Sequence, residues 1–234
     1  MKAVILAGGQ GSRLRPITAQ KPKPLCTLLG KPVIRHILTL LAQQQVEEAA
    51  VTLGYQGGRI REELEESSPI PLSFFQEDTP LGTAGGVKIA ANGFAGDFLV
   101  VSGDAMCDFD LQAALRFHQK KGGAVTLLVH RVDDPRDYGL VCADSEGRIL
   151  SFAEKPSYLE CVCDMANTGI YILSPSVLEQ IPEGKPVDFA ADLFPQLLEM
   201  GRPLYAYEPK GYWCDIGDIE SYRSCQADML AGKV

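Results

Sequence analysis

The chain has 234 residues, 46% of them hydrophobic and 22% charged, and a formal net charge of −8 at pH 7. This composition is typical of a globular protein with a sizeable core, and the acidic balance argues against a general nucleic-acid-binding protein. The first apolar run, Ala3–Ala7, is too short for a signal peptide. No run approaches the roughly 20 apolar residues of a membrane-spanning helix, so we expect a cytoplasmic protein without a membrane partner.

In the first half, short apolar runs alternate with segments of helical period. The predicted strands are Ala3–Ala7, Ala49–Leu53, Leu72–Phe75, Phe98–Ser102 and Val125–Val129. The predicted helices are Pro32–Gln45, Arg59–Glu66, Ala84–Ala91 and Leu111–Lys120. This alternation predicts an α/β fold, a doubly wound, mostly parallel mixed sheet with helices on both faces.

The second half is richer in strands. Strands are predicted at Leu140–Ala143, Ile149–Phe152, Gly169–Leu173 and Leu204–Tyr207, and helices at Pro175–Gln180, Asp188–Met200 and Ile219–Leu230. Residues Ser145–Gly147 indicate a hairpin turn. We expect one domain, 1–234, whose second part forms a smaller lobe along one wall of a cleft. The chain is expected to be either a complete small protein or one domain of a longer polypeptide, and a homo-oligomer is possible.

Seven cysteines occur in the sequence: Cys26, Cys107, Cys142, Cys161, Cys163, Cys214 and Cys225. The number is odd, no CxxC pair occurs, and the single residue between Cys161 and Cys163 is a poor spacing for a zinc site. We therefore expect reduced cysteines, several of them buried as small apolar side chains.

A glycine-rich turn follows the first strand, in AVILAGGQGSRLRPITAQKPKPL, residues 3–25. Gly8, Gly9 and Gly11 lack the Cβ atoms that would hold a phosphate away from the backbone amides. A Walker A loop would end in GK[ST], whereas here Gly11 is followed by Ser12 and Arg13. A Rossmann fingerprint would need a glycine where Leu14 stands. The turn therefore predicts a phosphate site that is neither a Walker A loop nor a Rossmann fingerprint.

Positive charge follows the glycines. Arg13 supplies a planar fork for phosphate oxygens, and Lys23 supplies a compact charge. Pro22 and Pro24 restrict the backbone on either side of Lys23. The segment therefore predicts a lysine held in a defined direction, as required for a small anionic ligand.

The string GGQGSRLRPITAQKPKPL resembles the signature of the sugar-1-phosphate nucleotidyltransferases. The resemblance continues in order through nearly the whole chain, in DTPLGTAGG, VVSGDAMCDFDL, EKP, NTG and GYWCDIGDIESY. It is strongest to mannose-1-phosphate guanylyltransferase-like proteins, some of which continue into further C-terminal domains. The resemblance implies a Rossmann-like nucleotide-diphospho-sugar transferase fold, with residues 1–130 as the nucleotide-binding half and residues 131–234 as the sugar-phosphate-binding half.

The family's reaction is attack by a sugar-phosphate oxygen on the α-phosphorus of an NTP, with loss of pyrophosphate. The resemblance implies that Arg13 and Lys23 are catalytic. It implies nucleotide contacts from Leu6, Ala7, Gly8, Gly9, Gly11, Ser12, Arg13, Gln76, Gly82, Thr83, Ala84 and Gly103. It implies sugar-phosphate contacts from Tyr138, Gly139, Glu154, Lys155, Asn167 and Thr168. Trp213 is left open between the sugar pocket and the core.

Two carboxylates are candidate Mg²⁺ ligands. Asp104 follows the apolar run Phe98–Val101, at the end of a strand where open α/β sheets bind ligands, and Asp215 comes from GYWCDIG. Two carboxylates, phosphate oxygens and waters suit Mg²⁺. Asp110 is expected to cap a helix, and Asp188 and Asp192 are expected at the start of another.

Several functions remain open from the residues. Within the family, GTP with mannose 1-phosphate is the first choice, and glucose 1-phosphate with UTP or dTTP is the alternative. A non-catalytic nucleotide-sugar sensor would lack Lys23 or the metal carboxylates, all of which are present. A glycosyltransferase would use a DxD motif such as Asp108–Asp110, which lies beyond the strand end. An oxidoreductase is disfavoured because the Rossmann fingerprint fails.

Overall fold

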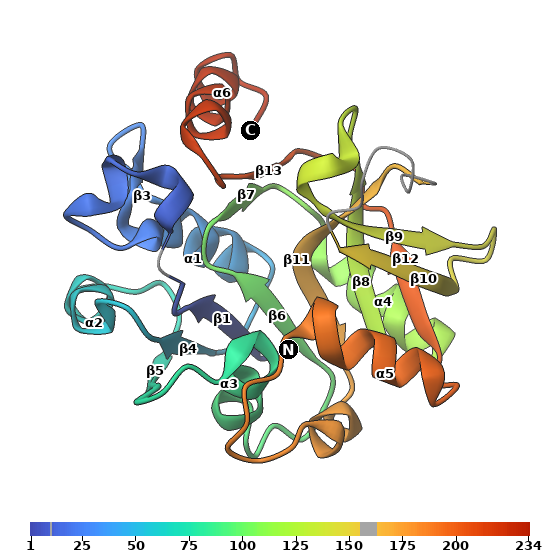
Figure 1. The fold of residues 1–234 in the computed structure, drawn as a ribbon. Helices are drawn as coiled ribbons and strands as arrows, with labels where there is room; N and C mark the ends of the chain where they lie inside the picture. The colour runs from blue at the N-terminus through green and yellow to red at the C-terminus, as the bar shows by residue number, and fades with distance from the viewer. Residues whose placement is uncertain (10, 155–162) are drawn as a thin grey trace.

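The structure is a computed structural model that describes residues 1–9, 11–154 and 163–234 (Figure 1). Its centre is a nine-stranded sheet. Seven strands lie side by side in the order β10-β9-β11-β6-β1-β4-β5; of the other two, β8 pairs with β11, and β12 pairs with β8. Helices pack on both faces of this sheet. The predicted α/β class, with a mixed and mostly parallel central sheet, is confirmed.

One half of the sheet is parallel. Its strands are β1 (Ala3–Ala7), β4 (Ala49–Leu53), β5 (Leu72–Gln76) and β6 (Phe98–Ser102), with β1 between β4 and β6. β4 is buried along its whole length and β1 along nearly all of it. Such continuous apolar runs are expected for parallel strands that are covered on both faces.

The other half is built around β11 (Met165–Leu173), which runs antiparallel to β6, β8 and β9. The remaining strands are β8 (Val125–Arg131), β9 (Gly139–Ala143), β10 (Ile149–Glu154) and β12 (Leu204–Tyr207). β9 and β10 form the predicted hairpin, and Gly147 in its turn has a φ of 78°. β11 is therefore the strand that joins the two halves.

The helices are α1 (Val33–Gln43), α2 (Gly57–Glu65), α3 (Gly82–Ala90), α4 (Leu111–Lys121), α5 (Phe194–Glu199) and α6 (Ile219–Leu230). Alternate residues of β1 face opposite layers. Ile5 belongs to the cluster that contains buried side chains of α1 and α2, whereas Val4 belongs to the cluster that contains those of α3 and α5. The sheet thus separates two cores, as its two-residue side-chain period requires.

Short elements complete the fold. Two-residue strands β2 (Thr27–Leu28) and β3 (Lys31–Pro32) pair with each other, and β7 (Ala105–Cys107) pairs with β13 (Trp213–Asp215). Short 3₁₀ segments occur at Ser12–Leu14, Ile17–Ala19, Lys23–Leu25, Pro135–Asp137 and Pro175–Gln180, and a π-helical turn at Phe189–Leu193. Among the described residues, no helix is both long enough and apolar enough to cross a membrane.

Most predicted elements lie where the sequence placed them, with two larger differences. β11 begins at Met165 rather than at Gly169, because Met165, Ala166 and Asn167 also pair with β8, before a shift of register between Asn167 and Tyr171. Gly169 sits in this interruption with a φ of 73°. The predicted helix Asp188–Met200 begins as a π-helical turn, and only its last part is α-helical.

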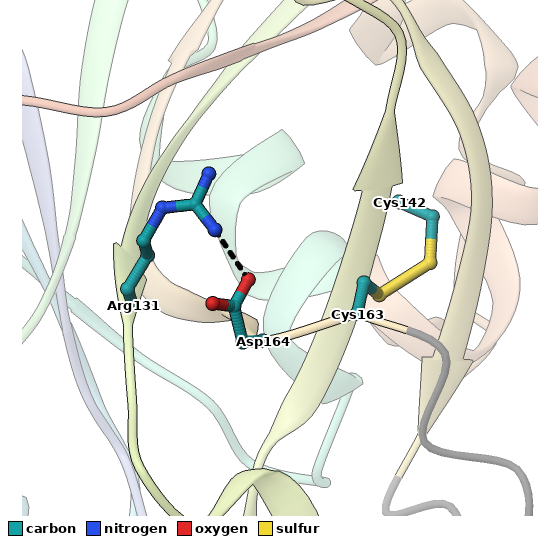
Figure 2. The surroundings of a disulfide bond; sticks show 4 residues. All are labelled: Arg131, Cys142, Cys163 and Asp164. Atoms are coloured by element: carbon teal, nitrogen blue, oxygen red, sulfur yellow. Dashed lines mark hydrogen bonds and ion pairs between the residues drawn. A yellow bond between two sulfur atoms is a disulfide. The ribbon is translucent and has the colours of Figure 1, made fainter.

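The prediction that the cysteines are all reduced is wrong for two of them. Cys142 of β9 and Cys163, just before β11, form a disulfide with a Cα–Cα distance of 5.9 Å (Figure 2). Next to it, Arg131 Nη1 lies 2.6 Å from Asp164 Oδ1. The pairing of β9 with β11 brings the two cysteines together, and their spacing in sequence gave no sign of it.

The other cysteines fit the expectation better. Cys26 and Cys225 are free and fully buried, and Cys107 and Cys214 are free and half-buried. Cys161 lies outside the described residues.

Candidate active site

Two adjoining cavities open at the carboxyl ends of β1 and β6, with volumes of about 210 and 360 Å³. They share lining from Leu6, Arg13, Lys23 and Asp104. This edge of a parallel sheet is where open α/β folds bind ligands. The smaller cavity lies over the glycine turn, and the larger one extends toward the second lobe.

Lys23 is held in place by its neighbours. It begins a helical turn, Lys23–Leu25, and Cys26 N donates to its carbonyl oxygen over 3.0 Å. Its side chain crosses Gly11, where an added Cβ would lie 2.8 Å from Lys23 Cβ. Gly11 also has a φ of 60°, which favours glycine. Glycine at position 11 therefore permits both the backbone turn and the close packing of the Lys23 side chain.

The Lys23 ammonium lies between two carboxylates. Nζ is 2.7 Å from Asp104 Oδ2 and 3.5 Å from Asp215 Oδ1, and Lys23 as a whole is only 8% exposed. Ser102 Oγ donates to the other oxygen of Asp104. The three charged side chains come from the loop after β1, the end of β6 and β13, so distant parts of the sequence meet at one point.

The pairing of β7 with β13 brings Asp215 to Asp104. Asp215 is in register with Ala105, and Ile216 N donates to Asp104 O over 3.3 Å. Neither three-residue strand was predicted, because so short a segment carries no measurable periodicity. The chemistry of Asp215 was inferred from its motif, whereas its position depends on this unpredicted ladder.

The electrostatics of the three groups are linked. Burial alone would lower the pKa of Lys23, but Asp104 and Asp215 together raise it above its usual value. Burial alone would raise the pKa of Asp104, yet the facing Lys23 ammonium keeps it below its usual value. Burial raises the pKa of Asp215, and Lys23 offsets only part of that effect. With the same lysine beside both carboxylates, the pKa of Asp104 is lowered and that of Asp215 is raised.

The two carboxylates suit Mg²⁺, since both are within reach of a single cation. Mg²⁺ is usually bound by one or two carboxylates together with substrate phosphates and waters. In the described part of the chain, no group of three or more His, Cys, Asp or Glu side chains is placed to hold a metal. Substrate phosphate oxygens and waters would complete the coordination beside Asp104 and Asp215.

The glycine turn contributes most of its predicted residues to the smaller cavity. Its lining includes Leu6, Ala7, Gly9, Gly11, Ser12 and Arg13. Gly8 instead packs on the turn after β4, where its Cβ would lie 3.4 Å from Gly54 N. Gly103 donates its N–H to Leu6 O over 2.8 Å, and neither Gly8 nor Gly103 lines a cavity. These two glycines allow close approach of backbones around the site.

Of the predicted nucleotide contacts between residues 76 and 84, one lines the larger cavity. Thr83 lines it, whereas Gln76, Gly82 and Ala84 line neither cavity. Gln76 is exposed at the end of β5, and Ala84 is fully buried within α3. Glu77 accepts a hydrogen bond from Leu81 N over 3.1 Å and so fixes the loop that leads into α3.

The second lobe supplies the opposite wall. Tyr138, Gly139, Asn167 and Thr168 all line the larger cavity, as the predicted sugar-phosphate contacts require. Thr168 Oγ1 donates to Leu128 O over 2.7 Å, so this hydroxyl is engaged within the sheet. Glu154 ends β10 in register with Gly139, and Lys155 lies outside the described residues.

Sequence reasoning missed several wall residues. The larger cavity is also lined by Ser102, Asp137, Tyr171, Asp188 and Phe189, and by Trp213, which the sequence left open between the sugar pocket and the core. Trp213 is 8% exposed, and its ring packs 5.6 Å from that of Tyr138, so it belongs to both the wall and the core. The NTGIY pattern could have suggested Tyr171, because a side chain four residues after Asn167 can share its face of a strand.

The remaining aspartates have structural contacts. Asp110 Oδ1 accepts from Ala113 N over 2.8 Å, which confirms the predicted helix cap. Asp108 Oδ1 accepts from Tyr212 N over 2.6 Å and ties β7 to the segment before β13. Neither residue lines either cavity, so the Asp108–Asp110 triplet does not form a DxD site here.

Residues 2–232 match the nucleotidyl transferase family. A UTP–glucose-1-phosphate uridylyltransferase from Synechocystis is 37% identical over 250 residues, covering 100% of this chain and 64% of that relative. The catalytic subunit beta of a mannose-1-phosphate guanylyltransferase from Drosophila pseudoobscura is also 37% identical, over 94% of this chain and 60% of that relative. The chain therefore spans less than two thirds of the length of either relative.

A solved structure shows the same architecture. HddC from Yersinia pseudotuberculosis superposes with a TM-score of 0.85 at 29% identity, covering 97% of this chain and 99% of that one. The same protein has also been solved in complex with GMP-PN. The similarity extends over nearly the whole of this chain.

Proposed function

This chain belongs to the nucleotidyl transferase family, and we propose that it joins an NTP and a sugar 1-phosphate into a nucleotide-diphospho-sugar with release of pyrophosphate. The sugar-phosphate oxygen attacks the α-phosphorus, and the bond from that phosphorus to the β-phosphate oxygen breaks. The nucleophile is already an anion, so no general base is needed. The difficulty is to hold two mutually repelling anions in line.

The observation that carries this proposal is the position of Lys23, which lies between Asp104 and Asp215 at the mouth of the sheet. A buried ammonium at the junction of two cavities can balance the charge of phosphates that enter from both sides. Arg13 lines both cavities as a second cation. We assign Lys23 to the reacting phosphate and Arg13 to the departing pyrophosphate, with the Gly9–Ser12 backbone holding the nucleotide.

The two lobes divide the substrates. Residues 1–130 bind the nucleotide and residues 131–234 bind the sugar phosphate, in one domain. Tyr138, Gly139 and Asn167 would contact the sugar from the wall of the larger cavity. Glu154 and Lys155 keep the roles that their motif implies, with the lysine on the phosphate of the sugar.

Mg²⁺ is the proposed cofactor, with Asp104 and Asp215 as its protein ligands. When bound, the ion would supply positive charge to the phosphate oxygens. Lys23 and Arg13 supply charge from the chain itself, and Ser102 orients Asp104 through its hydrogen bond. Trp213 and Tyr138 form part of the wall of the larger cavity.

GTP with mannose 1-phosphate is the first choice of substrates, supported by the names of the Drosophila relative and by the GMP-PN complex of HddC. The second choice is UTP or dTTP with glucose 1-phosphate, because the uridylyltransferase relative is equally identical.

The proposal is tested by measuring pyrophosphate release over a grid of NTPs and sugar 1-phosphates with Mg²⁺. We expect release with at least one purine or pyrimidine nucleotide, dependent on both substrates and abolished by chelation of the metal. Binding of nucleotide sugars without release from any pair would instead support a non-catalytic sensor. Pyrophosphate release with UTP or dTTP and glucose 1-phosphate, but not with GTP and mannose 1-phosphate, would favour the second choice over the first.

A further inference from the structure

The nucleotide-side loop and the second lobe are joined by backbone hydrogen bonds. Val187 N donates to Leu81 O over 2.8 Å, and Ala84 N donates to Val187 O over 2.9 Å. At Gly82, φ is 72° and an added Cβ would lie 2.4 Å from Val187 O, so only glycine permits this approach. Figure 1 shows the segment that leads to α5 running beside α3.

Side chains continue this junction on the wall of the larger cavity. Thr83 Oγ1 donates to Asp188 Oδ2 over 2.9 Å and accepts from Phe189 N over 2.9 Å. The other oxygen of Asp188 accepts from Ala190 N and Ala191 N. Thr83 and Asp188 both line the larger cavity, so the contact is part of the cavity wall. The threonine hydroxyl is held by a donor and an acceptor at once.

From Phe189 the contacts lead to the sugar side. The Phe189 ring is buried and packs 5.2 Å from the ring of Tyr171. Asn167 Nδ2 donates to the Tyr171 hydroxyl over 3.1 Å, and Gly169 N donates to Asn167 Oδ1 over 3.0 Å. An unbroken series of contacts therefore runs from Thr83 of the nucleotide loop to Asn167 of the sugar wall.

We propose that Thr83 and Asp188 are a positioning pair that couples the two substrate subsites. This inference rests on the proposed function. A nucleotide that orders the loop around Thr83 also fixes Asp188 and Phe189, and Phe189 in turn fixes the Tyr171 ring that orients Asn167. The sugar 1-phosphate then binds to a wall that is already ordered, so its affinity is higher when the nucleotide is bound, and the reverse follows by linkage.

The test measures this coupling at equilibrium. The dissociation constant of the sugar 1-phosphate identified in the grid is determined by calorimetry, with and without the α,β-imido analogue of its NTP, in which the bridge that the reaction breaks is replaced by nitrogen. The ratio of the two constants is the coupling factor. Thr83→Val removes both hydrogen bonds but keeps the shape of the side chain, and Thr83→Ser restores the hydroxyl. Thr79→Val, at an exposed threonine of the loop that precedes α3, is the matched control.

We expect Thr83→Val to lower the coupling factor at least about fivefold, the lower end of typical coupling. Thr83→Ser and Thr79→Val should stay near the wild type, and the KM for sugar 1-phosphate should rise more than kcat falls. An unchanged coupling factor in Thr83→Val would overturn the inference. An equal loss in Thr83→Ser would also overturn it, since packing rather than the hydroxyl would then be responsible.

A second variant covers the case in which Thr83→Val fails to fold. Tyr171→Phe keeps the ring packing and removes the hydroxyl that accepts from Asn167, so the coupling factor should fall here as well; no fall would overturn the inference. The two hypotheses fail differently. A wild type inactive with every pair removes the proposed function, whereas an active wild type with unchanged coupling in the variants removes only the positioning pair.

Discussion

The parallel and antiparallel halves of the sheet place their functional residues in different ways. In the parallel half, Asp104 follows closely on β6 and Lys23 lies in the loop after β1, so strand direction brings both to the same edge. In the second half, Asn167 lies within a strand whose register shifts, and Asp215 lies outside this sheet, on the separate three-residue ladder of β13 with β7. The first arrangement is encoded locally, and the second depends on long-range pairing.

This difference leads to an expectation about function and stability. Changes at the charged edge of the parallel half should mainly lower turnover, because they remove charge from the reacting phosphates. Changes in the second half and at the junction should mainly lower stability or substrate affinity, because they disturb the packing that holds the wall of the cavity. Each of the following measurements can break or sharpen that contrast.

The largest effect is expected at Lys23. Lys23→Met keeps the aliphatic packing across Gly11 but removes the charge, and we expect kcat to fall by about 10²–10³-fold, as for a lost transition-state contact. Steady-state pyrophosphate release measures this loss. The matched control is Lys21→Met, which should remain within about twofold of the wild type. Equal effects of the two substitutions would show that general charge, rather than the position of Lys23, matters.

The next effect belongs to the second half. The Cys142–Cys163 disulfide spans 21 residues of sequence, and a loop of this size implies a loss of about 3 kcal/mol of unfolding free energy on reduction. Urea denaturation with and without dithiothreitol measures it, and Cys142→Ser should make the protein insensitive to the reductant. Thiol titration of the denatured chain should give two more thiols after reduction. An identical number of thiols in both titrations would mean that the bond does not form.

A smaller effect is expected at the junction of the halves. Gly82→Ala places a methyl group against Val187 O, whereas Gly93 has a similar φ of 87° with no atom within 4 Å of an added Cβ. Both substitutions strain the backbone, but only the first also creates a clash. We expect Gly82→Ala to be the more destabilising by at least about 1 kcal/mol in urea denaturation. Equal losses would mean that the two segments are not in contact at this point.

The smallest effect is expected at Asp110. Asp110→Ala removes the cap of α4 and should lower the unfolding free energy by about 1 kcal/mol, with kcat within about twofold of the wild type. Asp110→Asn should restore the cap and the stability. A large loss of kcat in Asp110→Ala would contradict the structural role and revive the DxD interpretation of this triplet.

The sequence was most informative where structure is local. β1, β4 and β6 were predicted to the residue, and Asp110 was correctly recognised as a cap because its partner is three residues away. The sequence was less informative where distant segments meet. The Cys142–Cys163 bond, the β7–β13 pair and the Thr83–Asp188 contact join residues whose proximity no spacing reveals.

The candidate site divides along the same line. The family motifs predicted Arg13, Lys23, Asp104, Tyr138 and Asn167, and the structure places all five on the two adjoining cavities. Gln76, just upstream of a motif, and Ala84, within that motif, line neither cavity, because a motif marks a stretch of chain and not the direction of each side chain. Tyr171, Asp188 and Phe189 reach the wall only through the packing of the second half.

The central claim is that fixed positive charge at the mouth of the parallel strands joins two repelling phosphates. The most direct test is a crystal structure of the protein with its nucleotide-sugar product and Mn²⁺, with the metal located by anomalous scattering. The account predicts a metal peak bonded to Asp104 and Asp215, with the diphosphate beside Lys23 and Arg13. A product whose diphosphate and metal lie away from all four side chains would contradict it.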